Sequence, residues 1–306
     1  MKNIPVLLLL MLNIRMLGSE QPAPAELLQE LVQSQQKTHS AIGWVDAGRL
    51  EFIVFSNKPA MQDHALPGPP LWGASVHAAS GQVLGGLKAN GKQTFVALRD
   101  GKVLWENPDL ISQDAPEVSP NGKVLILNAR DKKTGADGLL LVENQGQKIT
   151  QISRDGKNPS WSSDESRFVY EEKGEAVVYD LPSQRKQRVG VGTSPSWSPD
   201  GKWITYKTAK SQFVLADARG EVQRTLVEGK GVLTRLYWSP DSDYLMYVRK
   251  SKVSGSLNCP DAKDVVAYRL GDGQSAAIYQ VCEGYPFWML RWVQLPSNVP
   301  LSVTGN

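Results

Sequence analysis

The chain has 306 residues, with 34 Lys and Arg against 31 Asp and Glu. Loss of an amino-terminal leader ending at Ser19 removes Lys2 and Arg15, which leaves 32 basic residues against 31 acidic ones and a mature net charge of +1. A chain this close to neutral has no electrostatic support for binding nucleic acid, so we expect no nucleic-acid partner.

Residues 1–19 predict a secretory signal peptide. Lys2 precedes an apolar run from Ile4 to Leu12, and the small residues Gly18 and Ser19 follow. The run is too short to span a bilayer comfortably, and Asn13 interrupts its extension. We therefore expect a periplasmic or secreted chain with no transmembrane span after cleavage; a retained signal anchor is the alternative.

Residues 20–38 predict a leader that contains a short amphipathic helix. Leu27, Leu28 and Leu31 share one helical face. The favoured interpretation is a cap that lies on the following domain, and the alternative is a helix that binds a partner.

One phrase organises the rest of the chain, and its best copy is Trp197-Ser198-Pro199-Asp200-Gly201-Lys202. Proline presets φ at the second position of a turn, aspartate accepts hydrogen bonds from nearby backbone N–H groups, and glycine accepts a positive φ. A strand should therefore end near Trp197. The aromatic and β-branched run that begins at Trp203 should form the returning strand of a hairpin.

The same turn recurs along the chain at intervals near the roughly 40 to 45 residues of a four-stranded propeller blade. Clear copies begin at Trp161 and at Trp238, and a copy without tryptophan begins at Val118. One fainter copy includes Trp44, and another starts at Leu87. Trp292 marks a candidate seventh copy. Because each blade exposes apolar faces that only its neighbours cover, residues 39–306 should form one all-β domain, a propeller of six blades or alternatively seven.

The phrase resembles the WD40-like β-propeller repeats of the TolB type, which also occur in the propeller domains of prolyl oligopeptidases and dipeptidyl peptidases. The resemblance covers about residues 40–295. It implies fold and no chemistry, because the phrase consists of a turn and a packing residue. The residues that it marks as structural repeat residues are Trp44, Trp161, Trp197, Pro199, Asp200, Gly201, Trp238, Pro240 and Asp241.

The chain has two cysteines and three histidines. Cys259 lies in an insertion of the sixth repeat and Cys282 lies just past the fourth strand of that repeat, so both fall on one rim of a four-stranded meander. In an exported chain this placement predicts a Cys259–Cys282 disulfide, with two free thiols as the alternative. His39, His64 and His77 lack the spacing of a metal site, so we expect no metal and no cofactor.

We find no catalytic constellation in the sequence. A serine peptidase of the related families needs a Gly-x-Ser-x-Gly elbow, which is absent. A propeller lyase of the oligogalacturonate type needs a histidine-rich metal centre, and no histidine follows His77. We expect a non-catalytic, monomeric propeller that binds a protein or cell-envelope component through a rim or the central opening. The alternatives are a propeller lyase, a small-ligand or glycan binder, and a purely structural envelope protein.

Overall fold

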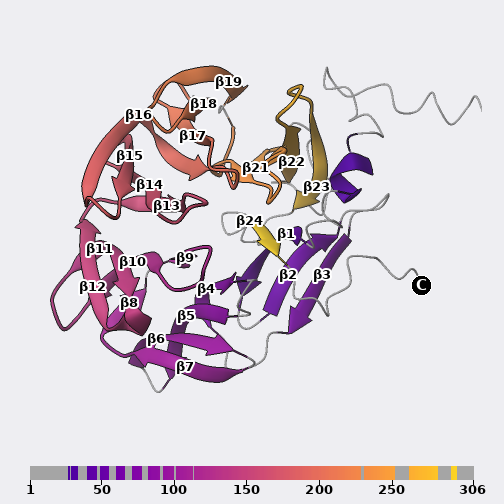
Figure 1. The fold of residues 1–306 in the computed structure, drawn as a ribbon. Helices are drawn as coiled ribbons and strands as arrows, with labels where there is room; N and C mark the ends of the chain where they lie inside the picture. Colours follow the sequence, from indigo (N-terminus) through magenta and orange to yellow (C-terminus); the bar gives the residue numbers. More distant parts are fainter. Residues whose placement is uncertain are drawn as a thin grey trace, which may run out of the picture.

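The computed structural model describes residues 27, 29–33, 40–46, 49–54, 60–65, 71–77, 82–89, 92–99, 101–112, 114–228, 231–251, 262–281 and 291–294. Across these ranges the chain is all-β, apart from a helical segment within residues 27–33 and a single 3-10 turn, η2 (Asn144–Gly146). The strands form antiparallel sheets that follow one another in chain order around a common centre (Figure 1). The expected all-β class is confirmed.

Four of the sheets have four or five strands. The first has the order β24 (Arg291–Gln294), β1 (Ser40–Asp46), β2 (Arg49–Val54) and β3 (Ala60–Ala65). The second contains β4 (Trp72–His77), β5 (Gln82–Ala89), β6 (Lys92–Arg99) and β7 (Lys102–Asn107). The third contains β8 (Leu110–Ser112), β9 (Glu117–Val118), β10 (Leu125–Asp131), β11 (Asp137–Glu143) and β12 (Lys148–Ser153). The last contains β20 (Tyr237–Trp238), β21 (Tyr244–Lys250), β22 (Lys263–Arg269) and β23 (Ser275–Val281).

A seven-stranded sheet lies between the third and the last. It contains β13 (Lys157–Trp161), β14 (Arg167–Glu172), β15 (Glu175–Asp180), β16 (Arg185–Trp197), β17 (Trp203–Thr208), β18 (Gln212–Asp217) and β19 (Val222–Glu228). Strand β16 pairs with β15 up to Val191 and with β17 from Gly192 onward. Two four-stranded units therefore share β16, whose first half is the last strand of one unit and whose second half is the first strand of the next.

Gly192 allows β16 to pass from one unit to the next. A Cβ atom at this position would lie 2.4 Å from the carbonyl oxygen of Lys207, a contact that side chains do not tolerate. Two residues later, Ser194 has a φ of 54°, and the register shifts between Thr193 and Ser196. The close backbone approach at Gly192 thus accompanies an irregularity that redirects the strand.

In every unit except the first, the first two strands pair in a common register. The paired residues lie seven positions apart, as the spacing of the phrase requires: Val76 with Val83, Val118 with Leu125, Trp161 with Phe168, Trp197 with Ile204, and Trp238 with Leu245. The residue at the glycine position of the turn has a positive φ in the four later copies, whether or not it is glycine: Gly122, Glu165, Gly201 and Ser242.

This register corrects two of the faint copies. Trp44 lies on β1, the second strand of its sheet, and the hairpin that follows it joins second to third strands. The copy at Leu87 has the same error, since its turn joins β5 to β6. Both matched through turn chemistry alone, which any hairpin in a blade can share. In the second sheet, Val76 on the first strand takes the tryptophan position of the phrase. In the first sheet, Trp292 takes this position and pairs with Ile42.

The helical segment packs against the last sheet. Leu27 and Leu31 are fully buried in a cluster with Met246 and Val265, and Glu30 forms an ion pair with Arg269 of β22. This packing agrees with the cap interpretation of the segment.

Candidate functional site

The tryptophans of the phrase join neighbouring sheets at the strands nearest the common centre. The Trp161 Nε1–H donates to the carbonyl oxygen of Glu117 (3.2 Å), and the Trp238 Nε1–H donates to that of Ser196 (3.3 Å). The Trp292 Nε1–H donates in the same way to the carbonyl oxygen of Tyr237 (3.1 Å). Each accepting residue comes directly before the residue at the tryptophan position of the neighbouring unit. These positions are Val118, Trp197 and Trp238.

Trp197 uses different hydrogen bonds. Its indole N–H donates to the carbonyl oxygen of Gly201 within its own turn (3.2 Å), and its backbone N–H donates to Ser160 Oγ of β13 (2.9 Å). Its side chain is 3% exposed and packs with Val169, Val178 and other apolar residues from both units of the seven-stranded sheet. Trp197 therefore belongs to the core between the two units.

One arginine links three sheets near the centre, where Figure 1 places β9 and β13. Arg235 Nη2 lies 2.6 Å from Glu117 Oε1 on β9, and Nη1 donates to the carbonyl oxygen of Pro159 on β13 (2.9 Å). The guanidinium also stacks over the Tyr237 ring, with Cζ 5.1 Å from the ring centroid. The side chains of Arg235 and Glu117 are 14% and 26% exposed. We call these residues, Glu117, Pro159, Arg235 and Tyr237, the axial cluster.

Burial of the axial cluster removes water from the guanidinium, which by itself disfavours the charged form. The Glu117 carboxylate and the Tyr237 side chain outweigh that loss, so the pKa of Arg235 is raised above its ordinary value. Arg235 is therefore permanently cationic, and its donors are directed at protein acceptors. The geometry gives this arginine a structural role in joining the sheets.

The turns of the four later copies, from Val118 onward, form a rim in which neighbouring turns contact one another. The Asn121 amide donates to the Glu165 carboxylate, which joins the third sheet to the seven-stranded sheet. The Asp200 backbone N–H donates to Ser242 Oγ (3.0 Å), which joins the seven-stranded sheet to the last. We call this side of the molecule the turn rim. Pro199 and Pro240 lie in two of these turns.

The aspartates of the turn rim act as turn formers. Asp200 Oδ1 accepts hydrogen bonds from Ser198 Oγ (2.6 Å) and from the Lys202 backbone N–H (3.1 Å). Asp241 Oδ1 accepts in the same way from Ser239 Oγ (2.5 Å) and from the Asp243 backbone N–H (3.1 Å). These carboxylates are occupied by their own turns.

The hydrogen bonds of Asp200 predict a pH dependence of stability. Partial burial opposes ionisation, but the Ser198 and Lys202 hydrogen bonds outweigh it and hold the pKa of Asp200 below its ordinary value. A pKa lowered on folding adds stability above the unfolded-state pKa of about 3.9, and that stability is lost as the pH falls through the folded-state pKa. Asp200→Asn should therefore lower the urea midpoint at pH 7, and the difference from wild type should shrink at pH 2 to 3. An equal difference at both pH values would contradict this assignment.

A groove opens on the turn rim between the second and third sheets, with a volume of about 720 Å³. Arg99, Leu104 and Trp105 line it from β6 and β7. Asn121 and Lys123 of the β9–β10 turn and residues 144–147 of the η2 turn line it from the third sheet. Trp105 closes part of the floor, because its ring lies against Gly146 and 5.6 Å, centroid to centroid, from Phe95. We call this feature the rim groove.

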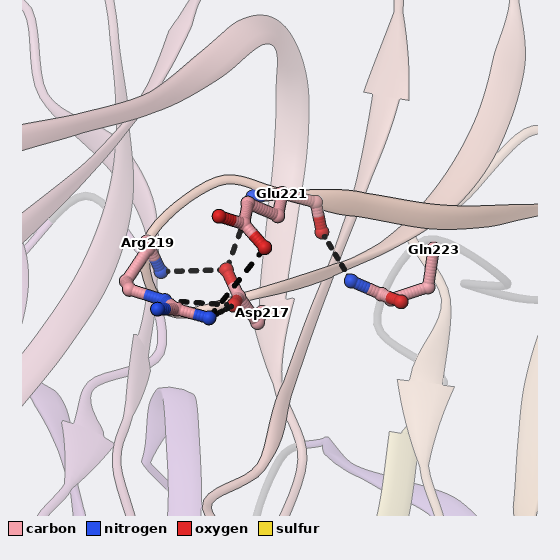
Figure 2. Close-up of polar contacts among 4 residues, drawn as sticks. All are labelled: Asp217, Arg219, Glu221 and Gln223. Atoms are coloured by element: carbon pink, nitrogen blue, oxygen red, sulfur yellow. Dashed lines mark hydrogen bonds and ion pairs between the residues drawn. The ribbon is translucent and has the colours of Figure 1, made fainter.

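The η2 turn has a counterpart in the turn between β18 and β19, shown in Figure 2. There Asp217 Oδ1 accepts hydrogen bonds from the backbone N–H groups of Arg219 (2.8 Å) and Glu221 (3.0 Å). Asp217 Oδ2 accepts two more from the Arg219 guanidinium, at 3.1 and 3.0 Å. The charges of Asp217 and Glu221 are therefore partly balanced by Arg219 within the same turn. The hydrogen bond from the Glu221 backbone N–H, together with those from Arg219, lowers the pKa of Asp217.

The structure describes two of the three histidines and neither cysteine. Cys259, Cys282 and His39 lie outside the described residues, so the disulfide stays a prediction. His64 lies on β3 and His77 on β4, in different sheets. Within the described ranges, no group of three or more His, Cys, Asp or Glu side chains is placed to hold a metal ion. Among the helical residues that the structure covers, none belongs to a helix long and apolar enough to cross a membrane.

Comparisons with known proteins identify the class of fold. The structure superposes on TolB from Acinetobacter baumannii with a TM-score of 0.55 and 14% sequence identity, over 83% of this chain and 66% of that one. It superposes on a structure from Agrobacterium tumefaciens, provisionally assigned as TolB, with a TM-score of 0.52 and 16% identity, over 80% of this chain and 90% of that one. The chain therefore has a TolB-type β-propeller fold.

Sequence comparison adds a relative that covers part of the chain. An uncharacterized protein of Agrobacterium fabrum is 28% identical over 170 residues, which cover 50% of this chain and 55% of that protein. The chain thus spans about half the length of this curated relative and 66% of the Acinetobacter TolB. No protein-family model matches the sequence.

Sequence reasoning missed the axial cluster and the rim groove. Arg235 precedes a tryptophan of the phrase, but nothing in its local sequence points to Glu117, which lies 118 residues away. For the groove a signal was present, since the third copy of the phrase keeps the lysine at Lys123 and replaces the aspartate with Asn121. That replacement leaves Lys123 without the carboxylate that lies beside Lys202 in the copy at Trp197.

Proposed function

We propose that this chain is a non-catalytic binding propeller of the periplasm or cell exterior, which engages a protein or cell-envelope partner through its turn rim. Residues 1–19 serve as a signal peptide in this proposal, residues 20–38 as a leader, and residues 39–306 as a single propeller domain. The observation that carries the proposal is the combination of a TolB-type fold with an open groove on a rim whose neighbouring turns are otherwise joined to one another.

The proposal includes a closed ring of six blades. Each of the six first strands belongs to a unit of about four strands, because the seven-stranded sheet contains two units that share β16. Strand β24 supplies the first strand of the unit that contains β1, β2 and β3, so the two ends of the propeller meet in one sheet. This arrangement supports closure through mixed amino- and carboxy-terminal strands, which leaves fewer bare sheet edges.

The rim is a better binding surface than the centre. The axial cluster directs the Arg235 guanidinium at Glu117 and Pro159, so its donors are committed to the protein. A partner that entered there would have to break a largely buried ion pair, which is costly. The rim groove presents exposed Leu104 and basic side chains and requires no such rearrangement.

Fractionation combined with cross-linking tests this function. The full chain, tagged at its carboxy terminus and expressed in its source organism, should appear in the periplasmic or extracellular fraction. Cross-linking there should capture a partner in a complex that saturates with cross-linker and that excess untagged chain competes away. A chain found in the cytoplasmic fraction, or one that stays free of partner at every cross-linker concentration, would contradict the proposal.

A further inference from the structure

We propose that the rim groove binds an extended acidic peptide segment, with carboxylates placed against Arg99 and Lys123 and an apolar side chain placed against Leu104. This inference rests on the proposed binding function and assigns to it a site and a class of partner. It follows from the charge of the groove, its exposed apolar surface and the outer edge of β7, with which no described strand pairs.

The charge of the groove comes from one substitution in the phrase. In the copy at Trp197, Lys202 Nζ lies 3.2 Å from Asp200 Oδ2, so the lysine has a carboxylate beside it. In the groove the equivalent pair is Lys123 and Asn121. The Lys123 backbone N–H still donates to Asn121 Oδ1 (2.8 Å), which preserves the turn. The amide carries no charge, however, so the ammonium group of Lys123 has no carboxylate within its own turn, unlike that of Lys202.

A second cation adds to this field. Arg99 lines the groove from the end of β6 and is exposed. Among the described residues that line the groove, none is an aspartate or a glutamate. Two acids near the groove bond to other residues: Glu165 accepts from the Asn121 amide, and Glu143 lies 2.6 Å from Lys148 Nζ. In the turn between β18 and β19, by contrast, Asp217 bonds to Arg219 (Figure 2). A groove with two basic residues and no acidic lining selects an anionic partner.

The apolar part of the groove favours a peptide over an inorganic anion. Leu104 is 42% exposed. The amide-rich η2 turn lines the same groove. A volume of about 720 Å³ falls within the roughly 300 to 1,000 Å³ range of ligand sites. An apolar side chain between two acidic ones matches this surface.

The strand edge favours an extended peptide over a glycan. Strand β7 lies at the end of its sheet, and no described strand pairs with its outer edge. Such an edge presents backbone N–H and C=O groups that an added strand can pair with. An extended segment gains these backbone hydrogen bonds together with the side-chain contacts.

Fluorescence anisotropy with synthetic peptides and the purified full chain tests this assignment. The probe alternates glutamate and leucine, and its counterpart of equal length alternates lysine and leucine. The acidic peptide should bind and the basic one should not, and binding should weaken as salt increases. Arg99→Glu and Lys123→Glu should each weaken the acidic peptide by about tenfold or more. The matched control is Lys210→Glu, which makes the same charge change in the exposed turn between β17 and β18 and should leave binding unchanged.

The outcomes separate the site from the function. Equal binding of both peptides, equal losses in all three variants, or no loss in the two groove variants would overturn the assignment of the groove. If the groove variants also keep the cross-linked partner in cells, the partner binds elsewhere and the binding function stands. If wild-type chain captures no partner in cells, the binding function itself fails, whatever the peptides show. Inorganic phosphate or a glycan could also displace the acidic peptide from the wild-type chain. If that competitor binds Lys123→Glu as tightly as it binds wild type, the peptide assignment is also overturned.

Discussion

Replacement of Trp197 with alanine is expected to lower the free energy of unfolding by about 3–5 kcal/mol, the usual cost of emptying a buried aromatic site. The Trp197 side chain is 3% exposed and fills the space between the two units that share β16. The substitution removes this packing and the indole hydrogen bond to the carbonyl oxygen of Gly201. Urea denaturation followed by far-ultraviolet circular dichroism measures the change.

The matched control for this prediction is Val222→Ala on β19 of the same sheet. Val222 is 52% exposed, so its truncation should change the free energy of unfolding by less than about 0.5 kcal/mol. A loss below about 1 kcal/mol for Trp197→Ala would show that the tryptophan is not part of the core between the units.

Replacement of Arg235 with methionine is expected to destabilise the fold by about 2–3 kcal/mol. Removal of one partner from a buried ion pair typically costs about 3–5 kcal/mol, and the residual exposure of this pair (14% and 26%) lowers the expected value. The loss arises because Glu117 keeps its charge in a partly buried place while the carbonyl oxygen of Pro159 loses a donor. Thermal and urea unfolding of the variant measure the effect.

A double-mutant cycle separates the ion pair from simple loss of packing. Glu117→Gln should also destabilise the fold, and the double variant Arg235→Met, Glu117→Gln should lose at least about 1 kcal/mol less than the sum of the two single losses. Additive losses would show that Arg235 and Glu117 contribute independently and that the axial cluster is not a unit.

Much of the fold followed from residue types at short range. The strand that ends at Trp197 and the returning strand that begins at Trp203 were predicted correctly, because the turn residues between them mark both ends. Turn chemistry alone was insufficient in the first two sheets. There the turns after Trp44 and Leu87 connect a different pair of strands from the turn after Trp197, and only the register distinguishes them.

The candidate site was harder to predict because it depends on contacts between distant segments. The axial cluster joins residues from three sheets, and no sequence period relates Arg235 to Glu117. The rim groove needs an edge strand of one sheet beside the turns of the next. Part of its charge could be predicted from the sequence, since comparison with the copy at Trp197 shows that Asn121 replaces the aspartate while Lys123 keeps the lysine.

The most direct test of partner binding at the turn rim is site-specific photo-cross-linking in cells. A photoreactive amino acid is placed in the full chain at Leu104 in the rim groove or at Lys210 in the turn between β17 and β18. We predict a saturable cross-link to an acidic segment of one partner at Leu104, its loss when Lys123→Glu is added, and no such product at Lys210. Capture of the same partner at both positions, or at neither, would contradict the account.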